Sequence, residues 1–179
     1  APGGGGLKTV ALAMALLLAA LAQAAVAPLF PLSAAVPDLC LLALVMVVAF
    51  GGPRAAMVAV PVVALSFAFA SNRSAALVLL AYLPLLPLAF VLEEGGLPLN
   101  RFAQTLVAGV ATGLWARLAL ALGAMADGAA PQPGLLVAAV LVPGVMLDLL
   151  MLTMAYLPLR ALGVEPRALE IPRSRYGWS

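Results

Sequence analysis

The segment PDLCLLALVMVVAFGGPR, residues 37–54, decides how this chain folds. No side chain between Asp38 and Arg54 is charged, and the segment closes in a Gly-Gly-Pro turn. Because proline suits the first turn of a helix, we expect a helix to begin near Pro37. An apolar helix with charges only at its ends is typical of a segment that crosses a membrane.

The same pattern, an apolar segment followed by turn residues, occurs five more times along the chain. A transmembrane helix needs about 20 mostly apolar residues, and short loops between consecutive helices place them antiparallel. We therefore predict an all-α integral membrane protein, a single bundle of six transmembrane helices within residues 1–162. The segment nearest the N-terminus, residues 7–27, is longer than the apolar part of a signal peptide, so we expect it to be a retained helix. The other five expected spans are 7–27, 54–70, 74–92, 101–125 and 134–159.

The composition excludes most other classes of protein. Hydrophobic residues make up 65% of the chain and charged residues 9%, whereas an ordinary soluble domain has about 45–50% and about 25%. The chain lacks histidine, the commonest general base and metal ligand. Its single cysteine, Cys40, excludes an internal disulfide or a thiolate metal cluster. Since a net charge of +2 is too small for nucleic-acid binding, we expect no enzyme activity, cofactor, metal site or nucleic-acid partner.

The basic residues predict which end of the bundle faces the cytoplasm. If the N-terminus is cytoplasmic, seven of the nine lie on the inner side, against Arg73 in an outer loop and Arg117 inside a span. Because positive charge marks the cytoplasmic side, we expect both termini there. The inner residues are Lys8, Arg54, Arg101, Arg160, Arg167, Arg173 and Arg175.

Residues 163–179 are expected to form a short basic cytoplasmic tail. Arg167, Arg173 and Arg175 in this tail, together with Arg160 at the end of the last span, have two interpretations. They anchor the last helix, or they dock a cytoplasmic partner. The two interpretations are compatible, since each basic residue near a membrane attracts anionic lipid by about 1 kcal/mol in either case.

Arg117 and Asp148 are charged residues inside the expected spans. A charge at the bilayer centre costs at least about 2.5–3.5 kcal/mol, so each needs a reason to be there. Counting about 1.5 Å per residue, the two lie roughly 10 Å apart in depth on antiparallel neighbours. Asp38 is the competing partner for Arg117. We favour a buried ion pair that fixes the helix register; the alternatives are a ligand or coupling-ion site, or an Arg117 side chain that extends outward beside Trp115.

Gly109 and Gly113 form a G-x-x-x-G pattern whose helix face continues through Arg117. Small residues at this spacing let helix backbones approach closely. Because the face also carries a charge, we expect it to pack inside the bundle; a homodimer through the same face is the alternative.

Proline interrupts three of the expected spans. Pro61 and Pro143 each predict a bend, and Pro84 with Pro87 predict two breaks in the fourth span, because each proline removes a backbone hydrogen bond. Within a membrane, the carbonyl groups freed in this way need partners inside the protein.

The order of these motifs resembles the MreD family, the rod shape-determining membrane proteins of bacteria. The likeness lies in Gln23 of the first span and in the triplet Pro37-Asp38-Leu39 that opens the second. It continues in the Gly-Gly-Pro-Arg turn that follows and in the sequence YLPLRAL, residues 156–162.

The resemblance implies a non-catalytic six-helix scaffold of the cell-wall elongation machinery in the bacterial inner membrane. Its partner would be an MreC-like membrane protein and, through that protein, the peptidoglycan synthases and the MreB filament. The MreD family is also distantly similar to the substrate-binding S-components of energy-coupling-factor transporters. The alternative is therefore a vitamin-binding S-component, in which Ala11, Ala15 and Ala19 contact a coupling subunit.

The polar residues expected near the outer face favour the scaffold. A vitamin site needs several convergent polar groups in an otherwise apolar pocket. The candidates are few, and Trp115 is the main aromatic side chain beside them. They are Asp38, Asn72, Arg73, Arg117 and Asp127.

Overall fold

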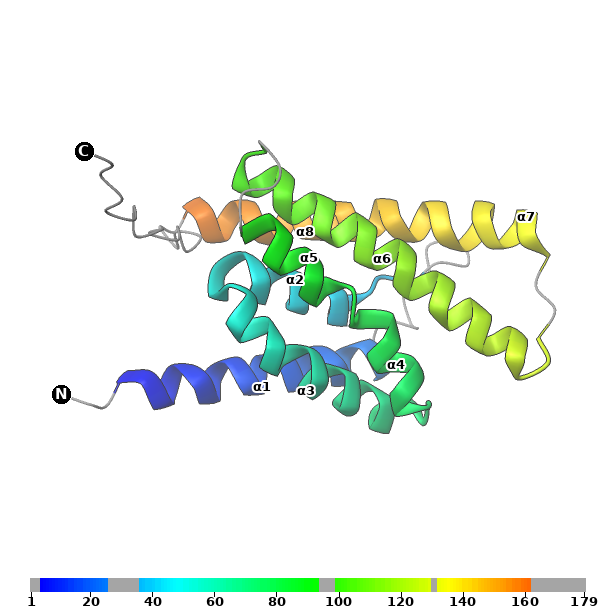
Figure 1. The fold of residues 1–179 in the computed structure, drawn as a ribbon, viewed down its shortest axis with the longest axis horizontal. Coiled ribbons are helices and arrows are strands. Elements are labelled where there is room, and N and C mark those ends of the chain that lie inside the picture. The colour runs from blue at the N-terminus through cyan, green and yellow to red at the C-terminus, as the bar shows by residue number, and fades with distance from the viewer. Residues whose placement is uncertain (1–3, 26–35, 94–98, 130–131, 162–179) are drawn as a thin grey trace, which may run out of the picture.

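The computed structural model describes residues 4–25, 36–93, 99–129 and 132–161, and every regular element within them is helical (Figure 1). The helices follow one another up and down the bundle, so the N-terminal end of α1 and the C-terminal end of α8 lie at the same end. The elements are α1 (Gly4–Ala25), α2 (Leu39–Gly51), α3 (Pro53–Ser71), α4 (Ala75–Tyr82), α5 (Leu85–Glu93), α6 (Arg101–Ala126), α7 (Pro133–Leu135), a π-helical segment (Leu136–Leu141) and α8 (Val142–Ala161). The expected tail, residues 163–179, lies outside the described residues.

Among the described residues, four helical segments are long and apolar enough to cross a membrane. They are α3, the consecutive helices α4 and α5, α6, and the π-helical segment continued by α8. The predicted boundaries of these segments fall within about two residues of the observed ones, because glycine, proline and polar residues at the turns end each helix. α2 is shorter: its 13 residues extend only about 20 Å at about 1.5 Å per residue.

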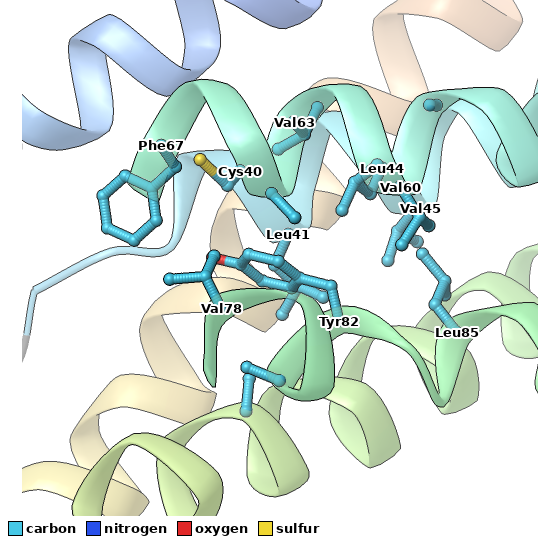
Figure 2. Packing of buried hydrophobic residues seen from close by; sticks show 14 of the residues in the cluster. Cys40, Leu41, Leu44, Val45, Val60, Val63, Phe67, Val78, Tyr82 and Leu85 are labelled. Atoms are coloured by element: carbon cyan, nitrogen blue, oxygen red, sulfur yellow. The ribbon is translucent and has the colours of Figure 1, made fainter. Parts of the chain in front are cut away.

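α2 lies at the centre of the bundle, where it contacts α1, α3, α6 and α8. Its apolar residues are spread all round the helix instead of along one stripe, which is typical of a helix surrounded by protein. Figure 2 shows this core, in which Leu41, Leu44 and Val45 of α2 pack against side chains from α3, α4 and α5. The central position of α2 brings both of its ends into contact with several other helices.

The start of α2 differs by two residues from the prediction. Asp38 is the N-cap, and its Oδ1 accepts a hydrogen bond from the Leu41 N–H at 2.8 Å. Aspartate is a favoured capping residue because its side chain satisfies an amide that the first turn leaves unpaired. Pro37 therefore lies before the helix and is buried.

The fourth span is broken once, and the prediction of a second break at Pro87 is wrong. α4 ends at Tyr82 and α5 begins at Leu85, on either side of Pro84. Pro87 lies in the first turn of α5, where a missing N–H costs no helical hydrogen bond. Pro84 frees the carbonyl of Leu80, and the indole Nε1–H of Trp115 on α6 donates to that oxygen at 3.0 Å.

The other two prolines are accommodated differently. Pro61 lies inside α3, which continues on both sides of it. Pro143 follows the π-helical segment, at whose end the Val142 N–H donates to the carbonyl of Val137, five residues earlier. A π-helical turn pairs each N–H with the carbonyl five residues earlier instead of four.

Candidate functional site: a buried ion pair and its hydrogen bonds

The structure brings Arg117 of α6 and Asp148 of α8 together. Arg117 Nη1 lies 2.5 Å from Asp148 Oδ2, and the two side chains are only 10% and 6% exposed. The same guanidinium nitrogen also donates to the carbonyl of Gly113 at 3.3 Å, one turn earlier in α6. The arginine side chain therefore spans the difference in depth between the two residues and does not extend outward.

Two glycines make room for this ion pair. A Cβ at Gly113 would lie 3.3 Å from both Arg117 Nη1 and Asp148 Oδ2. A Cβ at Gly144, one turn before Asp148 in α8, would overlap the guanidinium of Arg117. The absence of side chains at these positions lets the charged groups sit between α6 and α8.

The predicted G-x-x-x-G face points toward α8 and α2. Gly109 and Gly113 are buried, and a Cβ at Gly109 would overlap the side chain of Leu152 on α8. A Cβ at Gly113 would also lie 3.0 Å from Leu41 of α2. These glycines pack helices of one chain together, which leaves this face covered.

Asp38, the competing partner, contacts Asp148 instead of the guanidinium. The backbone N–H of Asp38 donates to Asp148 Oδ1 at 3.1 Å, so the two oxygens of Asp148 accept from different elements. The Tyr82 hydroxyl group on α4 lies 3.0 Å and 3.1 Å from the two carboxylate oxygens of Asp38. The cap of α2 is thereby joined to the ion pair and to α4.

α1 joins the same network through Gln23. The Oε1 atom of Gln23 accepts a hydrogen bond from the Leu39 N–H at 2.5 Å, at the first residue of α2. We call this network the polar cluster; its members are Gln23, Asp38, Tyr82, Arg117 and Asp148. It connects α1, α2, α4, α6 and α8.

The chemistry of the polar cluster is that of a structural network. Its arginine, carboxylates, hydroxyl and amide hydrogen-bond to one another or to backbone groups of the bundle. Buried charges are tolerated when they are paired and their remaining hydrogen-bonding capacity is met. Among the described residues, no group of three or more histidine, cysteine, aspartate or glutamate side chains could hold a metal ion.

Tyr82 and Gly144 belong to this site although the sequence did not single them out. Tyr82 is 1% exposed, and its ring extends from α4 toward Cys40 and Leu41 at the start of α2 (Figure 2). A tyrosine in an otherwise apolar span is a usable signal, since a buried hydroxyl generally has a hydrogen-bond partner. Gly144 has no such signal, because its role depends on which side chain faces it.

The remaining predicted residues lie apart from the polar cluster. Arg160 is exposed in the last turn of α8. Arg73 and Asp127 are also exposed, and Asn72 ends α3 in the left-handed conformation. Arg167, Arg173 and Arg175 lie outside the described residues.

A cavity of about 390 Å³ opens at the other end of α2, between its last two turns, the start of α3, the end of α5 and the first two turns of α6. Its polar side chains are those of Arg54, Glu93, Arg101, Gln104 and Thr105. It shares no residue with the polar cluster.

No protein-family model, curated protein or solved structure matches this chain.

Proposed function

We propose that this protein is a non-catalytic scaffold in the bacterial plasma membrane, similar to MreD, that crosses the membrane six times with both termini in the cytoplasm. In this proposal it binds an MreC-like membrane protein and, through it, influences the elongation peptidoglycan synthases and the MreB filament. It thereby helps to control peptidoglycan synthesis and rod shape.

The pairing of the polar cluster carries this proposal. Asp38 and Arg117 are candidates for a vitamin site near the outer face, and Arg117 with Asp148 for a ligand or coupling-ion site, but the charged groups of all three residues are used within the bundle. A transport subunit that captures a polar vitamin needs polar groups that remain available to the vitamin. A scaffold needs a helix arrangement that stays fixed while it holds a partner, and a buried network can supply that register.

The exposed face of α8 supports a site for a partner helix. Val142, Met146, Leu150, Met154 and Leu157 recur at helical spacing, and each is at least half exposed. This face begins after the π-helical segment, and the span to which it belongs has the smallest buried share of the four long segments. An apolar stripe with flexible methionines can bind the single membrane-spanning helix of a partner. When the partner is absent, lipid covers the stripe.

Co-expression with the MreC-like protein of the same organism tests the proposal. We expect the two proteins to co-elute in detergent, and Leu150→Trp or Met154→Trp in α8 to reduce the fraction in complex. Val58→Trp is the matched control, because Val58 is a comparably exposed apolar residue on α3. The scaffold proposal fails if the chain purifies with a bound vitamin and does not co-elute with the MreC-like protein; that result would favour the S-component alternative.

A further inference from the structure

We infer that the cavity at the end of α2 binds a phosphate ester that also carries a hydrogen-bond donor, such as a hydroxyl or an ammonium group. This site goes beyond the scaffold function and does not depend on it. The cavity of about 390 Å³ falls in the lower part of the range of about 300–1,000 Å³ that is usual for small-molecule sites.

Gln104 is the residue that points to a ligand. Its side chain lines the cavity and is 9% exposed, yet its Oε1 atom has no hydrogen-bond partner among the described residues. A buried polar atom without a partner costs about 1–3 kcal/mol, which a ligand or water in the cavity can offset. The neighbouring Thr105 hydroxyl does not serve Gln104, because it donates to the carbonyl of Arg101 at 2.8 Å.

The charges around the cavity favour an anion. Arg54 and Arg101 line it, and neither forms an ion pair with a carboxylate of the described residues. Guanidinium groups bind phosphate oxygens through paired, charge-assisted hydrogen bonds. Two cationic side chains beside one small cavity therefore select a phosphate group over a neutral ligand.

The N-terminus of α3 also borders this cavity. Gly52 and Pro53 at the start of α3 line it, and the N-cap of α3 provides no side-chain hydrogen bond to the first turn. α6 also begins at the cavity with Arg101, but the side chain of its N-cap Asn100 already accepts a hydrogen bond from the Ala103 N–H at 2.8 Å. Unpaired amide groups and the helix dipole make the N-terminus of α3 favourable for anions.

Glu93 and the Gln104 oxygen specify the second feature of the ligand. Both line the same cavity, and a carboxylate or an amide oxygen accepts hydrogen bonds. A ligand with phosphate oxygens alone would leave both acceptors without a donor. A hydroxyl or ammonium group near the phosphate provides one.

The remaining wall is apolar and includes Val45, Val48 and Ala108. Such a wall accommodates the methylene groups next to the phosphate. The same chemistry occurs in the head group of a membrane phospholipid and in a small soluble phosphate ester, so the experiment needs one probe of each kind.

The purified chain in neutral detergent is titrated with glycerol 3-phosphate, and its unfolding temperature is followed. Native mass spectrometry measures the binding of phosphatidylglycerol to the same preparation. Glycerol, which lacks the phosphate, and sulfate, which lacks the donor, are the chemical controls. We expect saturable stabilisation by glycerol 3-phosphate, saturable adducts with phosphatidylglycerol, or both, and at most weak, non-saturating effects of the controls.

Three variants locate the site. Arg54→Gln, Arg101→Gln and Gln104→Leu are each expected to raise the half-saturating concentration by about tenfold or more, since each removes one polar contact to the ligand. Gln104→Leu keeps the side-chain volume and removes the buried polar atom, so the protein remains folded. Arg160→Gln removes an exposed arginine on α8 that lies outside the cavity and is the matched control.

Each outcome decides the proposal. Binding of glycerol 3-phosphate alone identifies a soluble ligand, binding of phosphatidylglycerol alone identifies a lipid, and binding of both identifies a site for the shared chemistry. The proposal is overturned if neither probe binds saturably, if sulfate or glycerol binds equally well, or if Arg160→Gln weakens binding as much as the cavity variants do.

Discussion

The guanidinium of Arg117 on α6 lies against Gly144 on α8, so closely that a Cβ at residue 144 would overlap it. The arginine reaches Asp148 from this position. Close approach of α6 and α8 and burial of the ion pair therefore depend on each other.

Gly144→Ala is expected to destabilise the protein by about 1–3 kcal/mol, because the added methyl group must displace the guanidinium in a packed region. Unfolding in detergent, followed by heat or denaturant, measures the loss. Gly134→Ala is the control, since no atom lies within 4 Å of a Cβ there. Equal stability of the two variants would mean that Arg117 does not pack against Gly144.

Arg117→Ala and Asp148→Ala are each expected to cost about 3–5 kcal/mol, because each leaves one buried charge without its partner. The double variant should be less destabilised than either single variant, since it leaves neither charge behind. A double-mutant cycle on unfolding free energies measures this coupling. Simple additivity of the two effects would show that the pair does not form.

Tyr82→Phe removes one hydroxyl group that hydrogen-bonds to Asp38 and changes little else. We expect a loss of about 1–3 kcal/mol, because Asp38 Oδ2 then loses its hydroxyl donor while Oδ1 keeps only the Leu41 N–H. Tyr156→Phe is a matched control: Tyr156 is as buried as Tyr82, and its ring packs against Phe50 and Phe102, away from Asp38. Comparable losses in the two variants would contradict a special role of the Tyr82 hydroxyl.

Trp115→Phe tests how the break at Pro84 is accommodated. The change leaves the carbonyl of Leu80 without the indole donor, and we expect a loss of about 1–3 kcal/mol in unfolding free energy. Leu114→Ala, at a neighbouring exposed position, controls for the loss of apolar surface. Pro84→Ala restores a backbone N–H that can donate to the Leu80 carbonyl. In a protein that carries Pro84→Ala, we therefore expect Trp115→Phe to lower the unfolding free energy by less.

Much of the fold could be predicted because its signals are local. The ends of α3 and α6 follow from turn residues next to apolar runs, and the break between α4 and α5 follows from Pro84. The second break at Pro87 was not realised. Because α5 begins at Leu85, just after the break at Pro84, Pro87 falls in its first turn, where proline is tolerated.

The candidate site was predictable in its charged members. Arg117, Asp148 and Asp38 could be identified because charges in apolar spans are costly and need partners. Tyr82 and Gly144 could not be assigned in the same way, since one is compatible with an apolar core and the other has no side chain. Gln104 was equally inconspicuous, because a glutamine near a helix start is usually solvated.

The sequence by itself determined where the helices run and that a few buried charges need partners, because hydropathy, proline and glycine act over a few neighbouring residues. Only the tertiary structure decided which groups meet. Asp148 pairs with Arg117, 31 residues away, and accepts from the Asp38 N–H, 110 residues away. Those contacts depend on how each helix is rotated about its axis and which helices it packs against. The close packing of side chains between α2, α6 and α8 sets both.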